Sequence, residues 1–111
     1  MDIRTRRVGD VTVADMTGRL DSRTSGPAST ELNQLAQGAK AKLVLNVAGL
    51  DYVSSAGLRA ILVAAKLADV NGGALKVCDA NPAVRQVMEV SGMHSLLHLH
   101  ATEAEALASF E

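Results

Sequence analysis

The amino-acid sequence predicts the α/β fold class, with a small mixed sheet, an opening β-hairpin and alternating helices. Three observations lead to this class. Two short extended stretches meet at Gly9-Asp10, which fits a two-residue hairpin. The apolar run Leu43–Leu45, bounded by turn residues, is typical of a strand buried on both faces. Further along the chain, strand-like runs alternate with apolar residues spaced as in helices.

The chain opens with the hairpin. Ile3–Val8 and Val11–Met16 are its two expected strands, and glycine at the first turn position favours a type II′ turn at Gly9-Asp10. The next segment, Thr17–Ser22, is polar and rich in turn-forming residues, so we expect a loop there.

A first helix should follow this loop. Proline is tolerated at a first helical position, which places the start at Pro27, with Ser25 or Gly26 as the cap. Gly38 is the expected stop. The residues expected to face the core are Ala28, Leu32, Leu35 and Ala36.

The segment Lys42–Val70 is the part of the chain around which we expect the protein to be organised. Its apolar strand leads through Gly49–Tyr52 to two adjacent serines, Ser54 and Ser55. A helix begins directly after them, and its core face should hold Leu58, Ile61, Leu62, Ala65 and Ala68. Two hydroxyls therefore stand at a helix N-terminus, where free N–H groups and the helix dipole favour an anion.

The remainder of the chain predicts two more strands and two more helices. Asn71–Gly73 ends the second helix, Ala74–Asp79 is a strand, and Asn81-Pro82 caps and starts a third helix. One face of that helix should hold Val84, Val87, Met88 and Ser91, with an Arg85–Glu89 pair outside and Gly92 at its end. The last elements are a strand at Leu96–His100 and a short helix that carries Ala106 and Leu107 behind a Thr102–Glu105 capping box.

Length and composition limit the functions that the chain can have. Its 111 residues suffice for one core, so we expect a single domain over residues 1–111. Tyr52 and Phe110 are the only aromatic residues and the net charge is −1, which argues against nucleic acid and anionic membranes as partners.

The chain's single cysteine and its hydropathy bear on where the protein works. Cys78 stands alone in an apolar run, so we expect a buried, inert thiol and a reducing compartment. Residues 1–10 lack the apolar core of a secretory signal, and no apolar run approaches the ~18 residues of a membrane span. We therefore expect a cytoplasmic protein.

Two kinds of chemistry are disfavoured. The nucleophile turn of a hydrolase needs Gly-x-Ser-x-Gly, but Val53 stands at the first glycine position of this motif when Ser55 is taken as the serine. A catalytic base would also have to come from His94, His98 or His100. These histidines also lack a Cys, Asp or Glu at metal-ligand spacing, so we expect surface histidines, no metal and no cofactor. The Arg4, Arg6 and Arg7 cluster is expected to be a solvated strand face.

The two serines admit two interpretations. One of them can simply cap the helix, since serine is a favoured N-cap. The helix face opposite the core, however, is unusually apolar and carries two basic residues; it holds Arg59, Val63, Lys66, Leu67 and Val70. An apolar stripe beside two hydroxyls suggests a docking surface.

Three motifs in order resemble the STAS domain family, specifically bacterial anti-sigma factor antagonists. Leu43–Leu62, with SSAGL at Ser54–Leu58, is similar to the family signature. Gly18–Asp21 resembles the Gly-x-Leu-Asp turn before the first helix, and Asn81-Pro82-x-Val84 with Gly92 resembles the third-helix segment. The resemblance covers essentially the full chain and implies the STAS fold.

The resemblance implies that a serine at the start of this helix is phosphorylated. Alignment on Gly57 and Leu58 places that serine at Ser55, with Ser54 as the alternative, where relatives often have Asp. Asp21 matches an acidic residue near the modified serine, and Asn46 stands where the family strand often has Asp. The expected partner-binding residues are Asp21, Ser54, Ser55, Gly57, Arg59, Val63, Lys66 and Leu67.

The expected function is therefore non-enzymatic. The protein would sequester an anti-sigma factor serine kinase of the GHKL type and release it when Ser55 is phosphorylated, and a PP2C-like phosphatase would restore the hydroxyl. We expect a monomer or weak dimer. The alternatives are a STAS subunit of a signalling scaffold or lipid-transport complex, and a nucleotide-binding STAS domain, although no glycine-rich phosphate loop supports the latter.

Overall fold

The computed structural model describes residues 1–90 and 97–111, and its elements follow the predicted order. They are β1 (Asp2–Val8), β2 (Val11–Leu20), α1 (Ser25–Ala36), β3 (Lys42–Val53), α2 (Ser55–Val70), β4 (Ala74–Cys78), α3 (Pro82–Val90), β5 (His98–His100) and α4 (Glu103–Ala108). The predicted positions of Ser91, Gly92, His94 and Leu96 lie outside the described residues.

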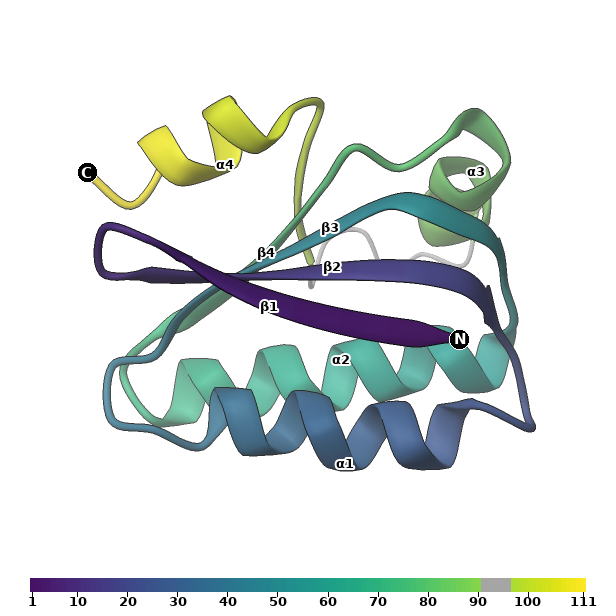
Figure 1. The fold of residues 1–111 in the computed structure, drawn as a ribbon, viewed down its shortest axis with the longest axis horizontal. Coiled ribbons are helices and arrows are strands. Elements are labelled where there is room, and N and C mark those ends of the chain that lie inside the picture. The colour runs from purple at the N-terminus through teal and green to yellow at the C-terminus, as the bar shows by residue number, and fades with distance from the viewer. Residues whose placement is uncertain (91–96) are drawn as a thin grey trace.

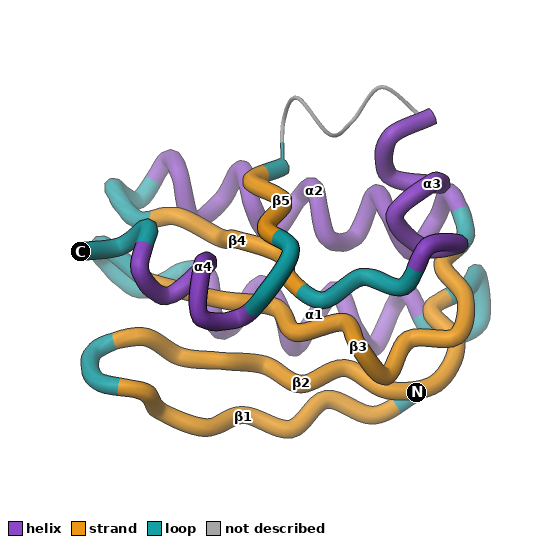
Figure 2. The backbone as a smooth tube through the Cα atoms, turned by 90° about the horizontal axis from the view of Figure 1, so that it is seen from above, coloured by secondary structure: helices purple, strands orange, loops and turns teal. Residues whose placement is uncertain are grey.

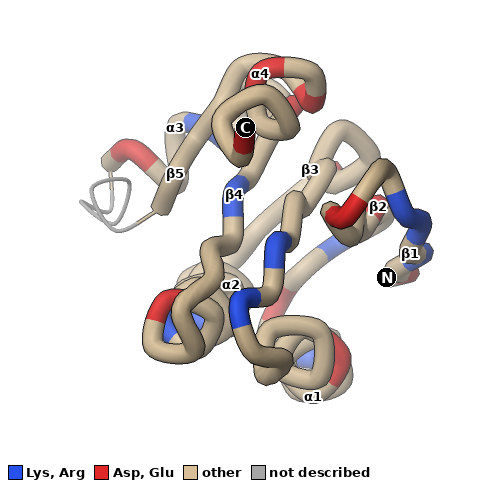
Figure 3. The backbone as a smooth tube through the Cα atoms, turned by 90° about the vertical axis from the view of Figure 1, so that its left-hand side faces the viewer, with Lys and Arg blue, Asp and Glu red and all other residues tan. Residues whose placement is uncertain are grey.

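The strands form one mixed sheet in the order β1-β2-β3-β4-β5, so the predicted α/β class is confirmed. β1 is antiparallel to β2, and the other neighbours are parallel. Helices α1 and α2 lie side by side on one face of the sheet, whereas α3 and α4 lie toward the other (Figures 1 and 3). Seen from above, β1 and β5 form the two edges of the sheet (Figure 2).

The opening hairpin has the predicted turn. Val8 pairs with Val11, and Gly9 has a φ of 62°. Asp10 does not share this positive φ, so the turn has the left-handed residue only at its first central position, as type II′ requires.

The loop predicted at Thr17–Ser22 is largely strand, and the strand predicted from the Leu43–Leu45 run extends past Gly49. β2 continues through Thr17–Leu20, and β3 continues through Gly49–Val53. The extensions pair with each other in parallel, from Thr17 opposite Gly49 to Leu20 opposite Val53. Their polar residues face outward while Leu20 and Leu50 are fully buried, so long-range pairing overrides the turn-like local composition.

The start of α1 also differs from the prediction. It begins at Ser25, with Thr24 in the N-cap position, and it ends at Ala36, before Gly38. The Thr24 hydroxyl does not cap the helix, because it donates to the Arg19 carbonyl (2.8 Å) and accepts from the Asp21 N–H (2.9 Å). The predicted core residues Ala28, Leu32 and Ala36 are buried, and Leu35 is only partly so.

The start of α3 is as predicted. Asn81 Oδ1 accepts from the Val84 N–H at 2.8 Å, and Arg85 pairs with Glu89 at 2.8 Å. Val84 and Met88 are buried, but Val87 is 36% exposed, which corrects the expectation that it faces the core. α3 contacts the sheet through a narrow stripe, and Val87 lies to one side of it.

The capping box of α4 is present in modified form. Thr102 Oγ1 accepts from the Glu105 N–H (3.2 Å), as predicted. The Glu105 carboxylate, however, accepts from the Ala101 N–H (3.3 Å) one residue before the cap. Arg6 is exposed, as predicted for a solvated strand face, but it also binds Asp15 and Glu103. Among the described residues, Arg4 pairs only with Asp2.

The interior has two parts. The main core lies between the sheet and helices α1, α2 and α3. A smaller core lies under α4 and consists of Val11, Val13, Val44, Cys78 and Ala106. Cys78 is 1% exposed, so the predicted burial of its thiol is confirmed, and this burial raises the pKa of the thiol.

A truncation in the β3 extension tests whether that segment carries core packing. Leu50→Ala should lower the free energy of unfolding by about 2–5 kcal/mol, because Leu50 is fully buried. The adjacent Asp51 is exposed, and Asp51→Ala should change it by less than about 0.5 kcal/mol. Urea unfolding measures both values, and similar small effects would mean that the extension is not packed.

Candidate functional site

The site lies where β3 passes into α2, and Ser54 holds this junction together. Ser54 is the N-cap of α2, and its Oγ accepts from the Gly57 N–H at 3.1 Å. Its carbonyl accepts from the Leu58 N–H at 2.8 Å. Both interactions belong to the first turn of the helix, so the Ser54 hydroxyl is engaged in stabilising α2.

Ser55 is in a different situation from its neighbour. It is the first residue of α2 and is exposed, and in the described part of the chain its hydroxyl has no hydrogen-bond partner. The free N–H groups and the dipole at the start of a 16-residue helix favour negative charge there. The structure therefore provides one engaged and one available hydroxyl.

The end of β2 brings Asp21 to the junction. The Ser54 N–H donates to the Leu20 carbonyl at 2.9 Å, so Asp21, the next residue, lies beside the two serines. Asp21 Oδ1 accepts from the N–H groups of Arg23 (3.0 Å) and Thr24 (3.3 Å). These hydrogen bonds lower the pKa of Asp21, which keeps the carboxylate charged at neutral pH.

Gly57 supports the site from beneath. A Cβ at this position would lie 2.6 Å from the Leu20 carbonyl oxygen and 2.7 Å from Leu20 Cγ. Only glycine therefore lets the first turn of α2 approach the end of β2 this closely. Gly57 is buried, which corrects its assignment to the partner-binding surface.

The outer face of α2 presents a line of residues that continues from Ser55. Arg59, Val63 and Lys66 are exposed and follow at helical spacing, and Val63 is 49% exposed. We call Ser55, Arg59, Val63 and Lys66 the α2 strip. Leu67, also predicted to lie on this surface, is only partly exposed and packs against the main core.

The deviation at Leu67 has a physical cause. α2 packs on the sheet with one side and on α1 with another, so Ala60 and Ala64 are also buried. The exposed face of α2 is consequently narrower than the exposed face of a helix that packs against only one neighbour. A groove of about 480 Å³ borders the strip between α2 and β4; it is lined by Leu62, Val63, Ala65, Lys66, Asp69, Ala74, Leu75 and His98.

Two residues near the serines were missed by the sequence analysis. Arg19 and Tyr52 are register partners on β2 and β3, and the Arg19 guanidinium lies 4.4 Å from the centroid of the Tyr52 ring. Tyr52 is 41% exposed. The sequence places Tyr52 two residues before Ser54, but the contact of Tyr52 with Arg19 forms only because β2 and β3 extend and pair in this region.

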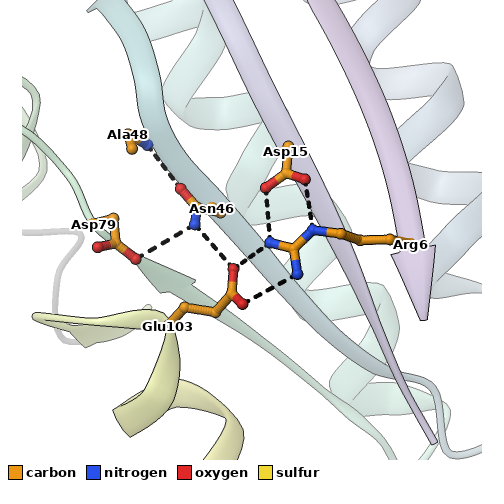
Figure 4. Close-up of polar contacts among 6 residues, drawn as sticks. All are labelled: Arg6, Asp15, Asn46, Ala48, Asp79 and Glu103. Atoms are coloured by element: carbon orange, nitrogen blue, oxygen red, sulfur yellow. Dashed lines mark hydrogen bonds and ion pairs between the residues drawn. The ribbon is translucent and has the colours of Figure 1, made fainter. Parts of the chain in front are cut away.

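The other candidate residues lie elsewhere. His98 is exposed and His100 partly buried, and the described residues contain no group of His, Cys, Asp and Glu that could hold a metal. Burial lowers the pKa of His100. Asn46 points into the polar cluster around Glu103 instead of toward the serines (Figure 4).

Comparisons with known proteins agree with this architecture. The family model described as STAS domain matches residues 2–106. The Anti-sigma F factor antagonist of Paenibacillus polymyxa is 30% identical over 91% of this chain and 87% of its own length. BtrV of Bordetella bronchiseptica is 31% identical over 100% of this chain and 96% of its own. The chain therefore belongs to the STAS domain family.

Solved structures share the fold. The anti-sigma factor antagonist SpoIIAA in its unphosphorylated form has a TM-score of 0.79 at 22% identity, covering 98% of this chain and 96% of SpoIIAA. The phosphorylated form of this Bacillus protein has a TM-score of 0.72 at 21% identity, covering 99% and 100%. Over the described residues, no helix is long and apolar enough to cross a membrane.

The close approach at Gly57 can be tested by adding one methyl group. Gly57→Ala should lower the free energy of unfolding by about 1–3 kcal/mol, because the new Cβ meets backbone atoms of Leu20 that cannot move freely. The control is Gly26→Ala in α1, where the added Cβ would have no described atom within 4 Å apart from its chain neighbours and the backbone of its own helix, so stability should not fall. Equal effects in urea unfolding would contradict the packing role.

The different roles of the two serines predict different stability effects. Ser54→Ala removes the N-cap hydrogen bond and should cost about 1 kcal/mol. Ser55→Ala should leave stability within about 0.5 kcal/mol of wild type, because its side chain is exposed. Thermal and urea unfolding of the two variants provide the comparison; a larger loss for Ser55→Ala would reverse the assignment.

Proposed function

We propose that this protein is an anti-sigma factor antagonist, a binding module without catalytic activity that acts in the cytoplasm. In its unmodified form it sequesters an anti-sigma factor kinase and so frees a sigma factor. The observation that carries the proposal is the available Ser55 hydroxyl at the exposed N-terminus of α2, beside an engaged Ser54. A relative named Anti-sigma F factor antagonist, 30% identical over most of both chains, supports it.

The partner would dock on the α2 strip and on the neighbouring Asp21. Val63 offers an exposed apolar contact, and Arg59 and Lys66 offer charge on either side of it. Ser55 lies at the start of this line, so a partner seated there would cover its hydroxyl. The modification site and the docking surface would then be the same surface.

Phosphorylation would switch this interaction off. A GHKL-type kinase would transfer the γ-phosphoryl group of ATP to Ser55 Oγ; the new O–P bond replaces the bond to ADP, and the hydroxyl proton leaves. A PP2C-like phosphatase would use water to return the hydroxyl and release inorganic phosphate. SpoIIAA, with the same fold, has been solved in phosphorylated and unphosphorylated forms.

The same negative charge has opposite consequences for the fold and for the interface. The phosphate adds about 1.5–2 negative charges at pH 7. At the start of α2 the helix dipole favours them by about 0.3–1 kcal/mol, and Arg59, four residues on, can supply a charge-assisted contact. A docked partner would instead have to bury a poorly paired dianion, which costs several kcal/mol.

The switch predicts a specific set of phosphorylation and binding results with the anti-sigma factor kinase encoded in the same genome. Radiolabel from ATP should enter wild type and Ser54→Ala but not Ser55→Ala. Ser55→Ala should still bind the kinase, whereas Ser55→Asp should bind at least about 100-fold more weakly, since each 1.4 kcal/mol is a factor of ten.

Titration calorimetry measures these affinities, and the Ser54→Ala variant controls for loss of the helix cap. Incorporation at Ser54 instead of Ser55 would move the switch to the other hydroxyl. Undiminished binding by Ser55→Asp would show that charge at this position does not block the interface.

A further inference from the structure

A second polar centre lies on the sheet face opposite α1 and α2, where Arg6 joins three elements (Figure 4). From β1, Arg6 Nε donates to Asp15 Oδ2 (2.8 Å) and Nη2 donates to Asp15 Oδ1 (3.1 Å) on β2. Arg6 Nη1 donates to Glu103 Oε2 (3.1 Å), and Nη2 also contacts Glu103 Oε1. The planar guanidinium thus binds one carboxylate of the sheet and one of α4.

Glu103 is held from a second side. Its Oε1 accepts from Asn46 Nδ2 on β3 at 3.0 Å, and the Glu103 side chain is only 24% exposed. The Arg6 and Asn46 contacts lower the pKa of Glu103, so the carboxylate is ionised at neutral pH. The first residue of α4 is therefore tied to β1 and β3, which are 97 and 57 positions away in the sequence.

Apart from this link, α4 and the residues after it are held by a small apolar cluster and by Lys76, whose Nζ lies 4.8 Å from the centroid of the Phe110 ring. α4 has six residues, far fewer than a helix needs to be stable alone. Ala106 of α4 packs on the buried residues Val11, Val13, Val44 and Cys78 of the sheet, and Leu107 and Phe110 are partly buried against this cluster. This small cluster is separate from the main core, so losing it would leave the packing of α1 and α2 intact.

We propose that residues 101–111 form a latch that opens as a unit while the remainder of the fold stays intact, and that the Arg6–Glu103–Asn46 link sets how often it opens. Segments with few buried contacts open at lower free energy than the whole protein. Opening exposes the Cys78 thiol and the apolar sheet residues that α4 covers. The latch does not depend on the function proposed for Ser55.

The single cysteine makes the latch measurable in the intact protein. Under native conditions at one fixed pH, Cys78 should react slowly with the thiol reagent DTNB, because it is 1% exposed. Glu103→Gln and Arg6→Gln should raise this rate about ten- to hundredfold, as expected for loss of a charge-assisted hydrogen bond.

Two matched controls separate the link from a general charge effect. Glu105→Gln changes the same charge in the same helix turn and keeps an acceptor for the Ala101 N–H. Arg4→Gln changes the same charge on β1, where Arg4 has Asp2 as its only side-chain partner among the described residues. Both should label within about twofold of wild type. If Glu103→Gln and Arg6→Gln label no faster than these controls, the link does not gate the thiol.

Urea distinguishes latch opening from global unfolding. Opening of α4 exposes little surface, so the labelling rate of wild type should be nearly independent of low urea concentrations. A rate that rises from zero urea with the slope of global unfolding would overturn the latch. The latch would also be overturned if the rise in the labelling rate of Glu103→Gln were fully accounted for by the lower free energy of global unfolding of that variant.

Discussion

The close contact between the first turn of α2 and the end of β2 is the constraint on which the site depends. The Leu20 carbonyl lies against Gly57 and accepts from the Ser54 N–H, so one backbone group positions both the helix and its cap. Any side chain at position 57 would push α2 away from the sheet. Asp21, the next residue after Leu20, reaches the serines through this contact.

The two adjacent serines differ in what their hydroxyl groups bind in the folded protein. The Ser54 hydroxyl supplies the hydrogen bond that the helix start requires, which leaves the Ser55 hydroxyl available to solvent. A negative group on Ser55 would stand at the positive end of the helix dipole, where the fold tolerates it. The same location is exposed and continuous with Arg59, Val63 and Lys66, so a partner bound there would not tolerate it.

The sheet separates this surface from the latch. α1 and α2 cover one face and, with α3, bury the main core, whereas α4 lies on the other face with a small core and a polar link to Arg6 (Figure 1). An event at Ser55 and an opening of α4 therefore involve different cores and different contacts. The β2–β3 pair, which contributes to both, is the common support.

The sequence by itself determined the order of elements, the Gly9 turn, the Asn81 cap and the strand-to-helix junction at the two serines, because these features depend on neighbours in the chain. Only the tertiary structure decided that Thr17–Leu20 and Gly49–Val53 are strands and that Leu67 packs inward. It also decided that Gly57 is buried and that Arg6 reaches Glu103. Each of these depends on a contact between segments far apart in sequence, which local composition and periodicity do not contain.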